Sequence, residues 1–100
     1  VGTPEWCQHI SQAAAYPITK YGNNIMYSFH LYAGDQSHMN MFYTQMLNAL
    51  YSVPVFVSEW GSSAASGGGG GINIENSNKF LNYLAKSNNK IYNNKKYYLN

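Results

Sequence analysis

Two short runs of apolar, β-branched and aromatic residues constrain the fold of this chain most strongly. Residues 25–32 read IMYSFHLY and are followed by a turn at Gly34, while residues 53–60 read VPVFVSEW and are followed by Gly61. Runs of this length and composition, bounded by turn residues, predict β-strands. Pro54 lies at the start of its run, where a strand tolerates proline. Because both runs are apolar almost throughout, we expect parallel strands that are covered on both faces.

The sequence between and after these runs has helical periodicity. Apolar residues recur at spacings of three and four from Ser37 to Tyr51, and again from Ile74 to Ala85. This spacing predicts one amphipathic helix in each segment. Ser37 and Asn73 are candidate N-caps of these helices. The order strand, helix, strand, helix predicts the α/β fold class with right-handed βαβ connections.

The chain is predicted to form a sector of a larger parallel α/β fold. Val1–Thr3 has the features of the end of a further strand, and a loop and a short helix follow it. Residues 1–87 are expected to form the folded part, and residues 88–100, which are rich in Asn, Lys and Tyr, a poorly ordered tail. Three strands leave two open sheet edges, so we expect the isolated chain to self-associate or to be partly molten.

The charge and hydropathy of the chain argue against two kinds of partner. The formal net charge is +2, and the six positively charged residues are all lysines, most of them late in the chain. A basic terminus of this kind is typical of a solvated tail and not of a nucleic-acid interface. No apolar run approaches the ~20 residues that span a bilayer, and no signal-peptide pattern is present. We therefore expect neither a nucleic acid nor a membrane as a partner.

Neither a metal nor a cofactor is expected. Cys7 is the only cysteine, so the chain cannot form an internal disulfide or a cysteine-based zinc site. The glycine run at residues 67–71 lacks the lysine that defines a phosphate-binding loop. A stretch of this composition is typical of a flexible loop, here beside the end of the second predicted strand.

Polar side chains lie at the predicted carboxyl ends of the strands, where ligands bind in parallel α/β folds. Glu59 ends the second run. His30 and Tyr32 end the first run, and they share one face because they are two residues apart. Trp6 follows Val1–Thr3. These side chains would form a sugar-processing site. The carboxylate would act as nucleophile or base, and the phenol and imidazole would hold it in place. The indole would stack on a pyranose ring.

A structural role is open for each of these residues. Glu59 also fits a salt bridge or a cap, although the chain contains no arginine to pair with it. His30 fits a hydrogen-bonded core histidine, and Tyr32 fits ordinary packing. Trp60 points to the opposite side of its strand from Glu59 and is expected in the core.

Three sequence blocks resemble a known enzyme family. The blocks VGTPEWCQ, IMYSFHLYAG and VPVFVSEWGSSAASG are similar, in order and spacing, to the second half of family 5 glycoside hydrolases, and most of all to the secreted endo-1,4-β-glucanases, or cellulases. The resemblance extends from Val1 to about Ser87. It implies a partial (β/α)8 TIM barrel that covers roughly strands 5 to 7 and their helices. It also implies an extracellular retaining hydrolase of β-glucans that needs no cofactor.

The resemblance implies roles for six residues. Glu59 corresponds to the catalytic nucleophile, and His30 and Tyr32 correspond to a His-x-Tyr pair whose tyrosine hydroxyl bonds the nucleophile. The implied substrate-binding residues are Trp6 on the aglycone side, Ala65 on the glycone side, and His38 in place of a cleft histidine.

The same resemblance identifies what this sequence lacks. Retaining hydrolysis uses two carboxylates about 5–5.5 Å apart, and the family's acid/base lies in an Asn-Glu-Pro motif that does not occur here. Glu5 and Asp35 are the only nearby substitutes, and neither is expected to act as the acid. We therefore expect the 100 residues to be inactive alone. The alternatives are a non-catalytic carbohydrate-binding remnant, or a related barrel hydrolase acting on mannan, xylan or xyloglucan.

Overall fold

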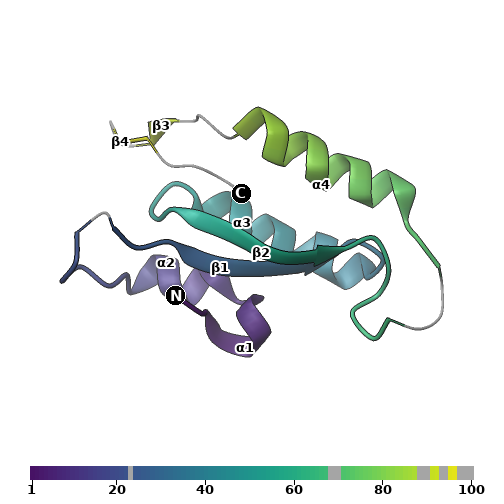
Figure 1. Cartoon of the computed structure of the whole chain (residues 1–100), viewed down its shortest axis with the longest axis horizontal. Helices are drawn as coiled ribbons and strands as arrows, with labels where there is room; N and C mark the ends of the chain where they lie inside the picture. Colours follow the sequence, from purple (N-terminus) through teal and green to yellow (C-terminus); the bar gives the residue numbers. More distant parts are fainter. Residues whose placement is uncertain (23, 68–70, 88–90, 93–94, 97–100) are drawn as a thin grey trace.

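A two-stranded parallel sheet lies at the centre of the molecule (Figure 1). β1 spans Tyr27–Tyr32 and β2 spans Val55–Gly61, and the two strands pair along their length. The computed structural model describes residues 1–22, 24–67, 71–87, 91–92 and 95–96. Both predicted strands and their parallel pairing are confirmed, and each strand begins two residues after the start of the apolar run that predicted it.

Val1 extends the sheet on the side of β1 that faces away from β2. Its ammonium group donates to the Met26 carbonyl at 2.8 Å, and its own carbonyl accepts the Ser28 N–H at 2.8 Å. In a parallel ladder, a residue on one strand bonds the two residues that flank its opposite residue on the next strand, as Val1 does here. The Thr3 hydroxyl also donates to the Ser28 carbonyl at 2.9 Å. Val1 therefore pairs as the predicted strand end would, although no strand is assigned to residues 1–3.

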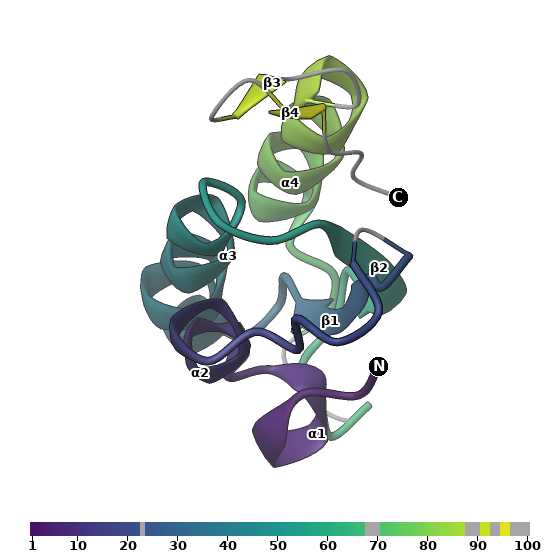
Figure 2. The ribbon, with the colours of Figure 1, turned by 90° about the vertical axis from the view of Figure 1, so that its left-hand side faces the viewer.

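Short helices surround the sheet. α1 spans Pro4–Cys7, α2 spans Ile10–Ala15, the π-helix η1 spans His38–Phe42, α3 spans Tyr43–Ala49 and α4 spans Ile74–Ser87. Figure 2 shows α2 and α3 together on one side of the sheet, with α1 beyond β1 and α4 beyond β2. η1 and α3 together confirm the first predicted helix, and α4 confirms the second.

The core lies between the sheet and the helices on that side. Phe29 and Leu31 of β1 and Val55 of β2 are fully buried, as are Met46 of α3 and Ile10 of α2. All five belong to one cluster of buried side chains. Burying a side chain of this size stabilises a fold by about 1.5–3 kcal/mol. The packing of this cluster therefore holds both strands in place against the helices.

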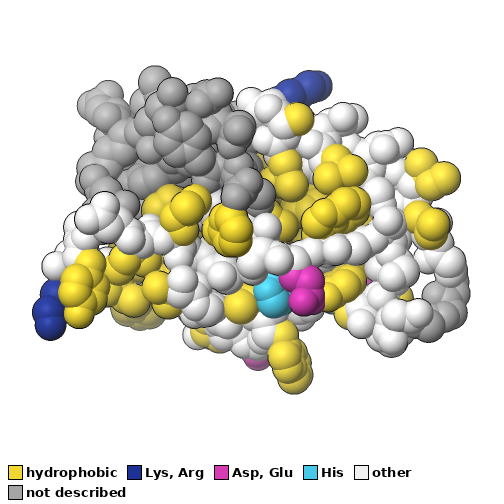
Figure 3. Space-filling model, in the orientation of Figure 1, with side chains coloured by type: hydrophobic (Ala, Val, Ile, Leu, Met, Phe, Trp, Pro, Cys, Tyr) yellow, Lys and Arg dark blue, Asp and Glu magenta, His cyan; other side chains and the backbone are white. Residues whose placement is uncertain are grey.

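α4 packs on the core through aromatic rings. The Phe80 ring is fully buried, and its centroid lies 6.0 Å from that of Tyr43 in α3 and 6.2 Å from that of Trp60 in β2. The prediction that Trp60 is a core residue is wrong, because 39% of it stays exposed. β2 is an edge strand of the described sheet, so the indole packs on Phe80 but is not enclosed. Figure 3 shows hydrophobic side chains exposed over this part of the molecule.

One of the two predicted N-caps is confirmed. Asn73 Oδ1 accepts the Asn76 N–H at 2.9 Å at the start of α4. Ser37 makes no side-chain cap and has helical dihedral angles of φ −62° and ψ −35°. The prediction for Ser37 is wrong because the helix begins earlier, where the Asp35 carbonyl accepts the N–H groups of His38 and Met39.

Replacing Asn73 by Ala should lower the free energy of unfolding by about 1 kcal/mol, the usual contribution of such a cap. The Asn76 N–H would lose the acceptor that satisfies it. Urea denaturation measures this change as a lower midpoint. Asn73→Asp keeps an acceptor oxygen at the same place and should retain the wild-type midpoint. An equal decrease of the urea midpoint in both variants would contradict the capping role.

Two short strands follow α4. β3, at Ile91–Tyr92, pairs antiparallel with β4, at Lys95–Lys96. The other residues from 88 to 100 lie outside the described residues. The prediction that they form a poorly ordered tail therefore stays a prediction. Within the described ranges, the structure contains no helix with the length and apolarity needed to cross a bilayer.

Candidate active site

A β-bulge brings Glu59 opposite His30. Phe29 pairs with Val57, but the next residue of β1, His30, pairs with Glu59, so Ser58 is an extra residue in β2. Bulges change the direction of the side chains that follow them and are frequent beside active sites. Without the bulge, Ser58 would lie opposite His30 and the carboxylate would lie one position further along.

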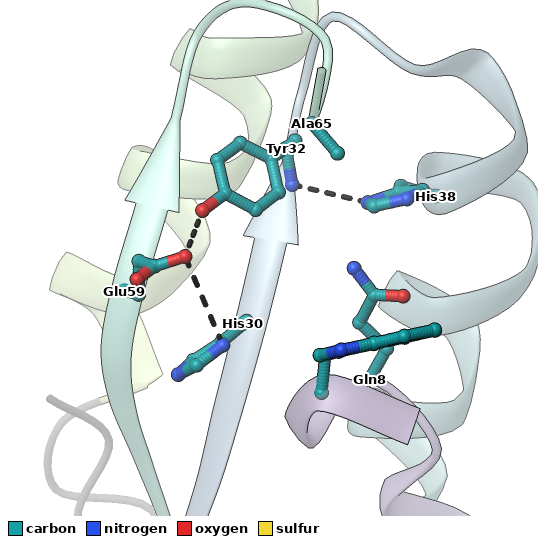
Figure 4. A pocket seen from close by; sticks show the side chains of 7 residues that line it. Gln8, His30, Tyr32, His38, Glu59 and Ala65 are labelled. Atoms are coloured by element: carbon teal, nitrogen blue, oxygen red, sulfur yellow. Dashed lines mark hydrogen bonds and ion pairs between the residues drawn. The ribbon is translucent and has the colours of Figure 1, made fainter. Parts of the chain in front are cut away.

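Two side chains of β1 approach a single oxygen of the Glu59 carboxylate (Figure 4). The Tyr32 hydroxyl donates a hydrogen bond to Glu59 Oε2, and His30 Nδ1 lies 3.9 Å from the same oxygen. The second distance is too long for a hydrogen bond. His30 Nε2 lies 3.0 Å from Ser58 Oγ, a contact that orients the ring. Within the described residues, no hydrogen bond or ion pair reaches Glu59 Oε1.

These groups line a cleft of about 360 Å³. The lining residues are Trp6, Gln8, His30, Tyr32, His38, Glu59 and Ala65. All six residues singled out from the sequence therefore border one cavity. Gln8 is the lining residue that the sequence did not indicate, because it lies in a short turn with no periodic pattern. It comes from the α1 side of the cleft, across from Glu59 (Figure 4).

Trp6 is carried by a turn with left-handed backbone. Glu5, Trp6 and Cys7 have φ values of 52°, 55° and 64°, a region that non-glycine residues seldom adopt. A contact of 2.9 Å between Glu5 Oε2 and His9 Nε2 spans the turn. Trp6 is 82% exposed, so its flat apolar face is available to a ligand at the edge of the cleft.

His38 packs behind Tyr32 and is only 7% exposed. Its Nδ1 accepts the Tyr32 N–H at 3.2 Å, and its Nε2 lies 3.6 Å from Asp35 Oδ2. Burial lowers the pKa of His38 below its ordinary value of 6.5, and the Asp35 carboxylate opposes part of that shift. An imidazole that accepts at Nδ1 is neutral and carries its proton on Nε2. His38 also opens η1, and π-helical turns are frequent at functional sites.

The stability of the fold should decrease as the pH falls below about 6.5, the unperturbed pKa of histidine. The folded pKa of His38 is the lower one, so in this range the unfolded state binds the proton first and is favoured. The decrease should level off below the folded pKa. Urea midpoints across this range measure the effect. His38→Asn keeps an acceptor for the Tyr32 N–H and should flatten the slope, whereas an unchanged slope would assign the effect to other groups.

The structure describes all four acidic side chains, and Glu59 is the one that lines the cleft. Glu5 is paired with His9. Asp35 Oδ2 accepts the Ala65 N–H at 2.9 Å. The remaining carboxylate, Glu75, lies exposed in the first turn of α4. The described residues contain no group of three or more His, Cys, Asp or Glu side chains arranged to hold a metal ion.

A family model described as cellulase of glycosyl hydrolase family 5 matches residues 1–95. The chain belongs to glycosyl hydrolase family 5. The resemblance in the three sequence blocks is thereby confirmed, and the family 5 match extends eight residues beyond Ser87.

The chain is similar to several bacterial endoglucanases. It is 38% identical over 89 residues to an endoglucanase of Clostridium saccharobutylicum and 36% identical over 89 residues to endoglucanase A of Evansella cellulosilytica. Each alignment covers 88% of this chain but only 19% and 17% of the two relatives. The chain therefore spans about a fifth of the length of these curated relatives.

The fold matches part of a solved family 5 catalytic domain. The catalytic domain of Thermobifida fusca endoglucanase Cel5A aligns with a TM-score of 0.70 and 27% sequence identity, over 86% of this chain and 29% of that domain. This neighbour implies the (β/α)8 architecture, and the parallel strands and covering helices described above are consistent with a part of such a barrel.

Proposed function

We propose that this chain is the part of a retaining endo-β-1,4-glucanase that carries the catalytic nucleophile, Glu59. The observation that carries the proposal is the unequal environment of the two carboxylate oxygens. Oε2 accepts the Tyr32 hydroxyl, while within the described residues Oε1 has no partner. A nucleophile needs one oxygen free to reach the anomeric carbon and an orientation fixed by other contacts.

The residues around Glu59 suit the two steps of a retaining reaction. Oε1 attacks the anomeric carbon, the bond to the leaving oxygen breaks, and the leaving oxygen takes a proton from an acid. Water then attacks the glycosyl–enzyme ester and gives a proton back to that acid, now acting as a base, and the carboxylate is released. Tyr32 holds Oε2 throughout, and His30 Nδ1 lies 3.9 Å from that same oxygen. Both side chains therefore act on the half of the carboxylate that does not form the new bond.

The substrate-binding roles follow from the rest of the cleft wall. Trp6 offers an exposed aromatic face on one side, and His38 and Ala65 border the cleft elsewhere. The endoglucanase relatives support a β-glucan as substrate. We infer an extracellular site of action, because an insoluble glucan polymer cannot reach an enzyme inside the cell.

The acid/base of the reaction comes from outside these 100 residues. Retention needs a second carboxylate about 5–5.5 Å from the nucleophile. Glu5 is paired with His9, and Asp35 accepts a backbone N–H, and neither lines the cleft. The chain alone is therefore expected to be inactive. Its cleft would then bind glucan without cleaving it, which is the second candidate function.

We assign β1 and β2 to roughly strands 6 and 7 of the barrel, with Val1–Thr3 as the end of strand 5. The parallel pairing of all three segments and the position of the cleft at the strand ends support this assignment. Residues 1–87 would then form part of the catalytic barrel. The exposed apolar side chains at the β2 edge support the expectation that the isolated chain self-associates.

Reducing-sugar release from carboxymethylcellulose tests the proposal in two proteins. One is the 100-residue chain, and the other is a chimaera in which residues 1–87 replace the matching segment of the Clostridium saccharobutylicum endoglucanase. The chimaera should be active, because the host supplies the second carboxylate, and the chain alone should be inactive.

Three outcomes would contradict parts of the proposal. A folded but inactive chimaera would favour the binding remnant. Activity of the chain alone would place an acid/base within it. A chimaera that prefers mannan, xylan or xyloglucan to glucan would retain the mechanism but change the substrate.

A further inference from the structure

Asp35 lies at the junction of two segments that border the cleft. Its Oδ2 accepts the Ala65 N–H at 2.9 Å and lies 3.6 Å from His38 Nε2. Ala65 belongs to the glycine-rich loop after β2, whereas His38 opens η1 after β1. One carboxylate oxygen therefore faces both segments, and the residue it faces on each of them lines the cleft.

The loop that carries Ala65 is closed at its base. The Asn73 N–H donates to the Ser62 carbonyl at 2.9 Å, so the first and last residues of the loop lie side by side. Surface loops whose ends lie this close are frequently functional. Asp35 holds the loop at a second point, beyond its base, because it bonds the backbone at Ala65.

We propose that Asp35 is a positioning residue that fixes the separation between Ala65 and His38 and so determines which sugar units fit between them. Its carboxylate holds the loop backbone at Ala65. The same oxygen faces the protonated Nε2 of His38, which leaves Nδ1 to accept the Tyr32 N–H. The contacts thus run from the loop to β1, and Tyr32 is the residue that bonds Glu59.

This role is distinct from that of a general acid. A general acid must reach the glycosidic oxygen with its proton, at hydrogen-bond distance. Asp35 does not line the cleft, and its Oδ2 is already an acceptor for a backbone N–H. The structure therefore assigns Asp35 to the support of the cleft wall.

Amide hydrogen exchange at Ala65, measured by NMR in the chimaera that carries residues 1–87, tests the proposal. Asp35→Ala removes the acceptor and should accelerate exchange of the Ala65 N–H by ~10-fold, the usual effect of losing one hydrogen bond to a charged group. Asp35→Asn keeps an acceptor oxygen and should retain most of the protection. The Asn73 N–H, which bonds backbone at Ser62, is the internal reference and should not change.

Titration of His38 is the second readout. The pKa of His38 should fall in both Asp35 variants, because the carboxylate that raises it has been removed. The rings of Tyr32 and Phe42 face His38 in both variants and are unchanged. Glu75→Gln removes a negative charge from the exposed first turn of α4 and is the matched charge control. It should leave both the Ala65 exchange and the His38 titration unchanged.

Catalysis by the chimaera is the third readout, and it rests on the proposed function. Asp35→Ala should raise KM for cello-oligosaccharides severalfold with a smaller change in kcat, and Asp35→Asn should restore most of the loss. A general acid would instead lower kcat by about 100-fold or more.

Unchanged exchange of the Ala65 N–H in a folded Asp35→Ala protein would overturn the proposal. Equal acceleration of exchange at the Asn73 N–H would also overturn it, because it would indicate general unfolding. A large kcat defect in both Asp35 variants would also overturn it. The exchange and titration need no activity, so their failure is distinguishable from a failure of the proposed function.

Discussion

Glu59→Gln should lower kcat of the chimaera on carboxymethylcellulose by about 10,000-fold or more, as expected when a catalytic nucleophile is removed. The amide has nearly the same shape as the carboxylate and keeps an oxygen for the Tyr32 hydroxyl. It cannot attack the anomeric carbon, so no glycosyl–enzyme forms. Reducing-sugar assays of the two purified proteins give the ratio directly.

The matched control is Tyr32→Phe, which removes the hydroxyl that bonds Oε2 but leaves the nucleophile in place. It should reduce kcat by a smaller factor, of about 10- to 100-fold. A fluorinated, activated glucoside that traps the intermediate should attach to Glu59, as peptide mass spectrometry would show. Attachment to another residue, or high activity in Glu59→Gln, would refute the assignment of the nucleophile.

Gly34→Ala should be the most destabilising single methyl addition in the described part of the chain. A Cβ built on Gly34 would lie 2.3 Å from the Ser63 carbonyl carbon and 2.5 Å from the Ala64 nitrogen. These are backbone atoms, so no side-chain rotation relieves the overlap. Overpacking of this kind costs about 1–3 kcal/mol, and it separates the turn after β1 from the loop after β2. Urea denaturation of the chimaera measures the free energy of unfolding.

Gly2→Ala is the matched control for that substitution. A Cβ on Gly2 would meet only Cys7 Sγ, at 3.8 Å, which is ordinary contact. This variant should unfold at the wild-type midpoint. If Gly34→Ala does so too, the close approach between the two loops does not contribute to stability. Because Gly34 donates its N–H to the Ser63 carbonyl at 3.0 Å, Gly34→Ala should also change activity by displacing Ala65 from the cleft wall.

Local sequence was sufficient to predict the two central strands and the two longer helical segments of this fold. The apolar runs, their turn residues and the helical spacing predicted β1, β2, the helix at η1 and α3, and α4. The Asn73 cap was also predictable, because a cap is formed by residues three positions apart. The cap predicted at Ser37 is not formed, because the helix begins earlier, at the Asp35 carbonyl. The prediction for Trp60 was wrong because alternation along a strand shows on which side of the sheet a side chain lies, but not whether another element covers that side.

The sequence by itself determined that His30, Tyr32 and Glu59 lie together, because strand ends and two-residue spacing place them at one edge of a parallel sheet. Only the tertiary structure decided how they meet. The bulge at Ser58 sets the register that brings Glu59 beside His30, and it leaves no mark in the hydrophobic pattern. The contact of Asp35 with Ala65 joins residues 30 positions apart. Such pairings depend on how packed elements approach one another in space, which the order of residues along one element does not specify.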